Sequence, residues 1–251
     1  MPEVPDHLPE NIIRQLLNKP LETERDRRQF AEIASHAAAR LSEGLALYRP
    51  RPQQAIAHSS PASEIVARGG VRSGKTIWAS TTFASVATRQ AIIGPDGKPL
   101  PFRFSTKRPL ILWVIGFDQS HIGQTIYRML FEEGAFKIIK DETTGLMRAW
   151  RPWEPEDKAR EAETRPAPPL IPERLVDKDS WGWEDKSKRV FTNCRLKNGN
   201  KIFAYSSKGE PKKGDPVDLI WIDEDIAFPG HVAEWQSRLS DNRGRLIWSV
   251  F

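Results

Sequence analysis

The sequence predicts an α/β fold in which a mainly parallel central sheet is flanked by helices. Residues 110–115 and 217–222 are almost wholly apolar, which is typical of parallel strands buried on both faces. A third strand-like run, residues 64–68, leads through a glycine-rich turn into a helical stretch at 75–89. Strands that alternate with helices in this way form βαβ units, and such units build parallel sheets.

The remaining pattern adds elements on both sides of this sheet. Residues 120–131 should form a helix with Ser120 as its N-cap. Asn198 and Gly199 stand between two strand-like runs, 189–196 and 201–206, and this dipeptide favours a hairpin turn. A helix at 231–239 and a strand at 245–251 complete the order.

Two segments differ from this core. Apolar residues recur at helical spacing before and after Pro20, so residues 1–47 should form an N-terminal helical subdomain. Residues 48–251 should form the core, with a long irregular insertion at about 150–186 that is rich in proline and charge. We interpret the insertion as a surface excursion. Its tryptophans could form a base-stacking surface for nucleic acid, but we expect them to be buried under the long loop. Because the chain ends within a strand at Phe251, we expect it to be a fragment of a longer protein.

Composition sets limits on function. The chain has 251 residues, a net charge of +5 and one cysteine, so an internal disulfide and a cysteine-rich zinc site are excluded. We expect Cys194 to be a buried structural thiol. The histidines lack the spacing of a metal site, and no run is long and apolar enough to span a bilayer. With no secretory signal at the start, a cytoplasmic protein without membrane contacts is expected.

A phosphate-binding loop is the firmest motif. The run Gly69-Gly70-Val71-Arg72-Ser73-Gly74-Lys75-Thr76 fits G-x-x-x-x-G-K-[ST] between a strand and a helix. The glycines allow backbone N–H groups to face phosphates at the helix N-terminus. Lys75 supplies charge to the β- and γ-phosphates, and the Thr76 hydroxyl ligates Mg²⁺. Arg72 either meets the γ-phosphate or faces solvent. The pattern predicts a P-loop NTPase, rather than a plain glycine-rich turn before a helix.

An acidic pair follows the apolar run at 217–222. Asp223 should hold the Mg²⁺ shell and Glu224 should polarise the attacking water. Both stand at the carboxyl end of a buried strand, where open α/β sheets bind their ligands. In isolation, two solvated acids that open a loop would explain the run equally well. Coupled to the phosphate loop, the pair favours ATP hydrolysis that drives mechanical work.

With these residues assembled, the chain resembles the ATPase domain of the phage terminase large subunit, the motor that packages viral DNA. Residues 48–54 look like the family's adenine-contacting segment, with Gln54 reading the base. The phosphate loop resembles its arginine-bearing Walker A motif, although many members place the arginine where this chain has Val71. Residues 214–224 resemble its Walker B motif, and residues 234–239 and 244–249 resemble the approach to its coupling motif.

The resemblance implies a RecA-like P-loop NTPase of the ASCE class in which Glu224, Lys75 and Arg72 are catalytic. It implies ATP and Mg²⁺ as cofactors, and a homo-oligomeric ring around double-stranded DNA that works with a portal protein and a small terminase subunit. Such a motor acts in the host cytoplasm and is not retained in the virion. The family's C-terminal nuclease domain is absent from residues 1–251, so no nuclease activity is expected.

Rings of this kind often complete each site with an arginine from the neighbouring subunit. Five arginines are candidates, and the sequence does not choose among them: Arg128, Arg148, Arg238, Arg243 and Arg245. Two other functions stay open. One is a helicase-like or other DNA-stimulated translocase, and the other is a binding module that holds nucleotide without hydrolysing it.

Overall fold

The computed structural model describes residues 43–70, 72–143, 145–210 and 216–250, together with Thr23, Glu24 and Arg27. The helical subdomain expected at 1–47 therefore lies outside the described residues, apart from these three positions and the segment from residue 43, which includes α3 (Gly44–Leu47). Val71 and Phe251 also lie outside them.

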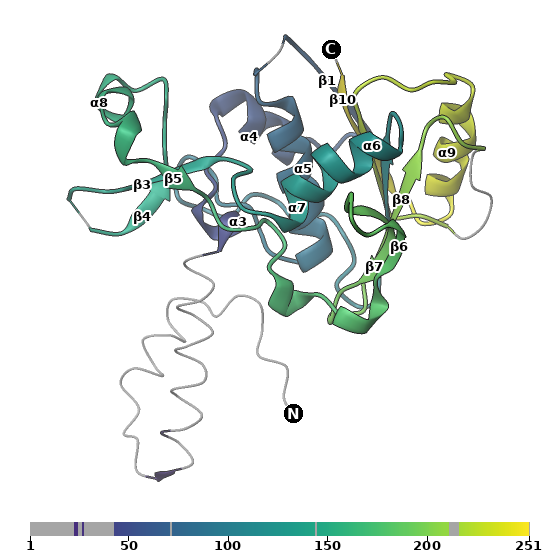
Figure 1. The fold of residues 1–251 in the computed structure, drawn as a ribbon, viewed down its shortest axis with the longest axis horizontal. Coiled ribbons are helices and arrows are strands. Elements are labelled where there is room, and N and C mark those ends of the chain that lie inside the picture. Colours follow the sequence, from purple (N-terminus) through teal and green to yellow (C-terminus); the bar gives the residue numbers. More distant parts are fainter. Residues whose placement is uncertain are drawn as a thin grey trace.

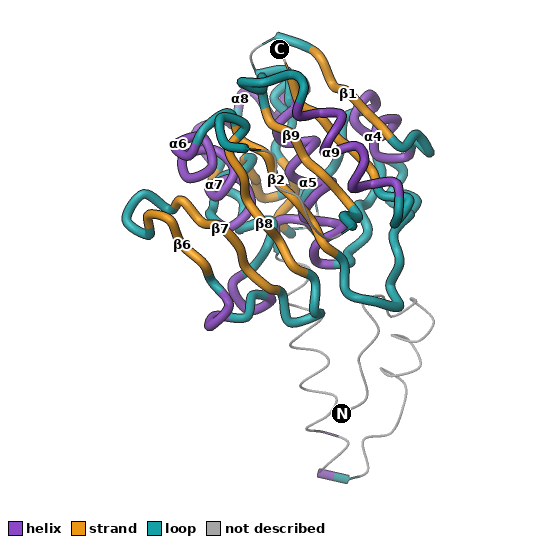
Figure 2. Tube along the Cα trace, turned by 90° about the vertical axis from the view of Figure 1, so that its right-hand side faces the viewer, coloured by secondary structure: helices purple, strands orange, loops and turns teal. Residues whose placement is uncertain are grey.

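A seven-stranded sheet forms the centre of the molecule, in the order β1-β10-β9-β2-β8-β7-β6 (Figure 2). Five neighbouring strands are parallel: β1 (Glu64–Arg68), β10 (Arg245–Val250), β9 (Leu219–Asp223), β2 (Ile111–Gly116) and β8 (Lys201–Ser206). At one edge β7 (Val190–Arg195) and β6 (Gly182–Asp185) run antiparallel. The expected mainly parallel sheet is confirmed.

Helices cover both faces of this sheet, as Figure 1 shows with the sheet seen nearly edge-on. On one face, Phe83 of α5 (Lys75–Thr88) packs against Trp221 of β9, with ring centroids 5.8 Å apart. On the other face, Ile220 and Ile222 of the same strand pack with Trp235 of α9 (His231–Ser240). Alternate residues of β9 thus serve two cores, which is why this run is apolar throughout.

The hairpin between β7 and β8 confirms the turn expected at Asn198-Gly199. Gly199 has φ +88°, a conformation that favours glycine. Cys194 of β7 is 2% exposed, as expected for a structural thiol, and burial raises the pKa of its thiol.

The helix after β2 starts earlier than expected and is not regular. Its first turn is α6 (Gln119–His121), followed by a π-helical segment η1 (Ile122–Tyr127) and by α7 (Arg128–Phe131). The expectation that Ser120 is the N-cap is wrong. Asp118 takes this position, because its Oδ1 accepts from the backbone N–H of His121 at 3.0 Å, and Ser120 Oγ donates to the same oxygen at 2.8 Å.

The segment between α7 and β6 begins with a small sheet of its own, in the order β4-β3-β5. It consists of β3 (Lys137–Lys140), β4 (Met147–Ala149) and β5 (Arg165–Pro166), with α8 (Pro155–Ala159) between the last two. Arg148 joins β4 to α8, since Nη1 and Nη2 each donate to Asp157 at 2.6 Å.

The later part of the insertion does not stay on the surface. Leu170, Ile171 and Val176 belong to the main core, and Trp181 stacks on Trp183 with centroids 4.9 Å apart. Two short 3₁₀ turns lie between these residues, Glu173–Leu175 and Lys178–Ser180, and a third, Glu161–Glu163, precedes β5. The expectation of a surface excursion is therefore wrong for this part, because its few apolar residues are spaced to reach the core between turns.

Within the described part of the chain, no helix has the length and hydropathy needed to cross a bilayer.

Candidate active site

The phosphate loop connects β1 to α5 and depends on two residues with positive φ. Gly74 has φ +90°, and a Cβ there would lie 3.0 Å from Gln54 Nε2. Arg72 has φ +61°, which is uncommon for a residue other than glycine. Lys75 Nζ donates to the carbonyl oxygens of Gly69 at 2.5 Å and Gly70 at 2.9 Å. The lysine ammonium therefore lies inside the curve of the loop.

A cavity of about 300 Å³ adjoins this loop and extends to the end of β9. Its lining comprises residues 72–77, Glu224 and Ser249. Gly69 and Gly70 do not line it, although they contact Lys75. The sequence-predicted loop residues Arg72, Lys75 and Thr76 thus share one cavity with the predicted catalytic glutamate.

Strand register explains why these distant residues meet. β10 lies between β1 and β9, with Arg68 opposite Val250 and Ser249 opposite Asp223. The three parallel strands therefore end at the same level, and the residues that follow them gather at one edge of the sheet.

Asp223 is buried behind the cavity wall, with 1% of its surface exposed. Its Oδ1 accepts from Ser249 Oγ at 2.5 Å, and its Oδ2 lies 2.9 Å from His121 Nε2. A buried carboxylate is stable only with such partners. Ser249 also accepts from the indole of Trp221 at 3.1 Å, so its hydroxyl is held in place.

Glu224 has the left-handed conformation, with φ +66°. Two hydrogen bonds with β10 hold the backbone of Glu224 in this conformation, both at 2.7 Å. The N–H of Glu224 donates to the carbonyl oxygen of Ser249, and Trp248 Nε1 donates to the carbonyl oxygen of Glu224. Its side chain remains 45% exposed at the cavity. A residue in such a conformation costs about 1–3 kcal/mol of backbone strain and is common at functional sites, where contacts with neighbouring residues hold it in place.

His121 is a site residue that the sequence analysis missed. It belongs to α6, directly after β2, and its Nδ1 lies 3.7 Å from Glu224 Oε2 while Nε2 contacts Asp223. Burial lowers the pKa of His121, but the hydrogen bond with Asp223 and the charges of Asp223, Glu224 and Asp118 raise it overall. One imidazole therefore touches both members of the acidic pair.

Thr76 and Asp223 supply the type of oxygen that a magnesium ion prefers. Mg²⁺ prefers hard oxygen ligands, and it is usually held by one or two carboxylates together with substrate phosphates and water. Thr76 lines the cavity, and the buried carboxylate of Asp223 is hydrogen-bonded to Ser249, which also lines it. Both oxygens of Asp223 already have partners in Ser249 and His121, and the role of Thr76 and Asp223 as magnesium ligands stays a prediction.

Gln54 lies beside the loop, but its side chain is already engaged. Its Nε2 donates to Gly74 O at 3.0 Å, and its Oε1 accepts from the backbone N–H of Arg51 at 2.9 Å and from Tyr48 OH at 3.3 Å. The residue therefore ties the start of α4 (Pro52–Ser59) to the phosphate loop. Its role in reading the base stays a prediction.

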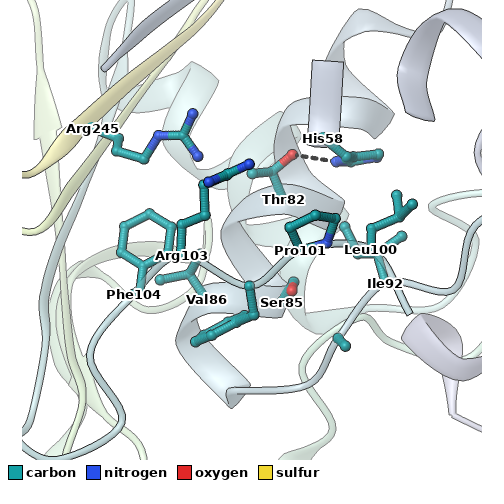
Figure 3. A pocket seen from close by; sticks show the side chains of 12 residues that line it. His58, Thr82, Ser85, Val86, Ile92, Leu100, Pro101, Arg103, Phe104 and Arg245 are labelled. Atoms are coloured by element: carbon teal, nitrogen blue, oxygen red, sulfur yellow. Dashed lines mark hydrogen bonds between the residues drawn. The ribbon is translucent and has the colours of Figure 1, made fainter. Parts of the chain in front are cut away.

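Three of the five candidate trans arginines are engaged within the subunit. Arg148 pairs with Asp141 and Asp157, and Arg238 pairs with Glu234. Arg245 lies at the edge of a small cavity under α4 (Figure 3), where it donates to the carbonyls of Ser60 and Ala62.

The other two candidates, Arg128 and Arg243, are exposed. No side-chain partner for either is present among the described residues. The choice of a trans arginine among the five candidates stays a prediction.

Comparison of the sequence with protein-family models and with curated proteins finds no match. Among solved structures, the chain is similar to an arginine-to-alanine mutant of the large terminase ATPase domain of Thermus phage P74-26. The identity is 15%, the TM-score is 0.43, and 81% of this chain and 65% of that chain are covered. It is also similar to the large terminase of the thermophilic bacteriophage D6E, with 13% identity and a TM-score of 0.42, covering 80% of this chain and 39% of that chain. The chain thus spans less than two thirds of both.

Proposed function

We propose that this chain binds and hydrolyses ATP with Mg²⁺, as the motor domain of a viral terminase large subunit that drives double-stranded DNA into a procapsid. The observation that carries the hydrolytic part is the single cavity shared by Lys75, Thr76 and Glu224. The packaging role is supported by the resemblance of residues 48–54, 69–76, 214–224, 234–239 and 244–249 to terminase motifs.

In this proposal each residue has a distinct task. Backbone N–H groups of residues 69–76 and the N-terminus of α5 bind the phosphates, and Lys75 balances their charge. Thr76 and Asp223 would hold the magnesium ion, which would supply positive charge to the phosphates. Glu224 accepts a proton from the attacking water. Arg72, which is exposed at the rim of the cavity, faces the γ-phosphate.

His121 and Ser249 position the acidic pair. They fix both oxygens of Asp223, and His121 also lies near Glu224. A preorganised site of this kind does not have to reorient during the reaction. The conformation of Glu224 then follows any movement of β10, which gives hydrolysis a mechanical connection to the rest of the subunit.

The proposed partners follow from the terminase resemblance. We place the domain in a homo-oligomeric ring on DNA in the host cytoplasm, with a portal protein and a small terminase subunit. Arg128 or Arg243 would complete the site of the neighbouring subunit. Activity per subunit should then rise with protein concentration and with added duplex DNA.

Steady-state ATP hydrolysis tests the proposal. Lys75→Ala should lower turnover by about a hundredfold or more, since it removes charge from the transferred phosphoryl group. Lys98→Ala is a matched control, because Lys98 is exposed and does not line the cavity. An ATPase rate in Lys75→Ala equal to that of the wild type would refute hydrolysis at this loop. A rate per subunit that stays flat with concentration and DNA would count against the ring motor.

A further inference from the structure

The small cavity under α4 lies beside the start of β1 and β10, whereas the phosphate loop lies at the ends of these strands. Arg245 borders the small cavity and is the first residue of β10, while Ser249 of the same strand lines the phosphate cavity. Other walls of the small cavity come from α5 and from the segment between α5 and β2 (Figure 3). About 30 Å³ is open inside it, which is room for one or two water-sized groups. The small cavity is therefore separate from the proposed catalytic site.

Two arginine side chains meet at this small cavity. Arg103 Nη2 donates to Ser59 O at 3.2 Å, and Arg245 Nη2 donates to Ser60 O at 2.6 Å. Because these carbonyl groups belong to consecutive residues, the two guanidinium groups lie close together, as Figure 3 shows. Burial, and then the charge of Arg103, lower the pKa of Arg245. Arginine stays charged in proteins, so two positive charges lie side by side here.

No carboxylate balances these two charges. The residues that line the small cavity include neither aspartate nor glutamate, and within the described part of the chain neither Arg103 nor Arg245 forms an ion pair. By contrast, Arg108 and Arg148 each pair with a buried aspartate. Like charges at close range repel one another. An anion between the two guanidinium groups would replace this repulsion with attraction.

Capping of a helix end explains only part of the arrangement. Ser59 is the last residue of α4 and Ser60 is its C-cap, and arginine side chains often donate to the carbonyl oxygens at a helix C-terminus. These bonds use Nη2 of each side chain, and Nε of Arg245 donates to Ala62 O at 3.0 Å. Nη1 of each arginine has no hydrogen-bond partner among the described residues. A guanidinium group offers five N–H donors, so donors remain for a ligand.

We propose that Arg103 and Arg245 form a binding site for a phosphate group at the mouth of this small cavity. Guanidinium forks match the oxygens of phosphate, and two of them balance a doubly charged oxyanion. The open volume admits one or two phosphate oxygens, while the rest of the group stays at the rim. The site goes beyond the proposed function, since it shares no residue with the phosphate cavity. Two sources supply such a group, the free phosphate ion and the backbone of DNA.

Calorimetric titration with inorganic phosphate tests the site. All variants are made in a Lys75→Ala parent, so that the phosphate loop contributes little to binding. Arg103→Gln should weaken phosphate affinity on the order of tenfold, because it removes hydrogen bonds to a charged ligand. Arg103→Lys retains the charge without the fork and should recover part of the loss.

Lys107→Gln is the matched control. Lys107 is exposed in the same segment between α5 and β2, and it does not line the small cavity. The control removes one positive charge, as Arg103→Gln does, and should bind phosphate like the parent.

Binding of a short DNA duplex, measured by fluorescence anisotropy, identifies the source of the phosphate. If DNA supplies it, Arg103→Gln should lower duplex affinity more than Lys107→Gln does, and should reduce the salt slope by about one. If the free ion is the ligand, only the affinity for inorganic phosphate should fall. An Arg103→Gln variant that binds both probes as Lys107→Gln does would overturn the site, and so would a parent that binds neither. Both results would leave ATP hydrolysis at the phosphate loop intact.

Discussion

At the residue scale, the acidic pair is defined as much by its neighbours as by its own sequence. Ser249 and His121 occupy the two oxygens of Asp223, and Trp248 with Ser249 fixes the left-handed backbone of Glu224. The terminase resemblance includes Trp248 and Ser249 in the approach to the coupling motif but gives them no role, and it does not include His121. The site is therefore a network of five side chains rather than two.

His121→Ala should lower the turnover number on the order of tenfold with little change in KM. It removes a hydrogen bond to a charged group, and this bond orients catalytic carboxylates rather than the nucleotide. His121→Gln, which retains a donor, should recover part of the rate. Steady-state kinetics of both variants check this. A rise in KM without a fall in turnover would assign His121 to nucleotide binding instead.

The sequence could have indicated His121. It stands a few residues after the apolar run 110–115, and the carboxyl ends of parallel strands meet at one edge of a sheet. What the sequence did not show was that β2 is the neighbour of β9. Strand order is a long-range property, and motif spacing carries no information about it.

At the element scale, α4 is held to α5 by a buried histidine. His58 lies 3.2 Å from Tyr48 OH and 2.9 Å from Thr82 Oγ1 (Figure 3 shows the second contact). Burial lowers its pKa to about 3. Because α4 also carries Gln54, whose side chain donates to Gly74 O, the hydrogen bond between His58 and Thr82 helps to hold the phosphate loop in place.

A pH dependence follows from His58. Between its folded pKa of about 3 and its unfolded pKa of roughly 6.5, only the unfolded chain binds the proton. The stability it contributes is therefore complete above the unfolded pKa and is lost as pH falls below it, by at most about 1.4 kcal/mol per pH unit. Urea unfolding at pH 7.5 and pH 5 measures this change. His58→Gln should show a smaller acid-induced loss, and equal losses in the two proteins would contradict the prediction.

Elements with a strong local pattern were predicted well, and elements set by tertiary contacts were not. The strands around Asn198-Gly199 and the helix after the phosphate loop needed only turn chemistry and apolar spacing. The π-helical segment η1 has no comparable signal. In the insertion, Leu170 and Ile171 belong to the core because they follow the small β4-β3-β5 sheet, which returns the chain toward the main sheet. The composition of the insertion does not predict this path.

At the scale of the whole molecule, two structural units meet at the start of α5. The parallel sheet delivers the phosphate loop, Asp223 and Glu224 to one edge, while the insertion supplies Trp150 and Trp153 beside it. The fold class and the two motifs were predictable because each depends on a short run of residues. The assembly of the two motifs into one cavity depends on how β10 separates β1 from β9.

The central claim is that Glu224 acts on water at the phosphate-loop cavity, and Glu224→Gln tests it most directly. Glutamine has nearly the same shape, so the variant should bind ATP within a few-fold of the wild type. It cannot accept the proton, so single-turnover hydrolysis of bound ATP should fall by about 10²- to 10⁴-fold. Cleavage of bound ATP by Glu224→Gln at the wild-type rate would contradict the account.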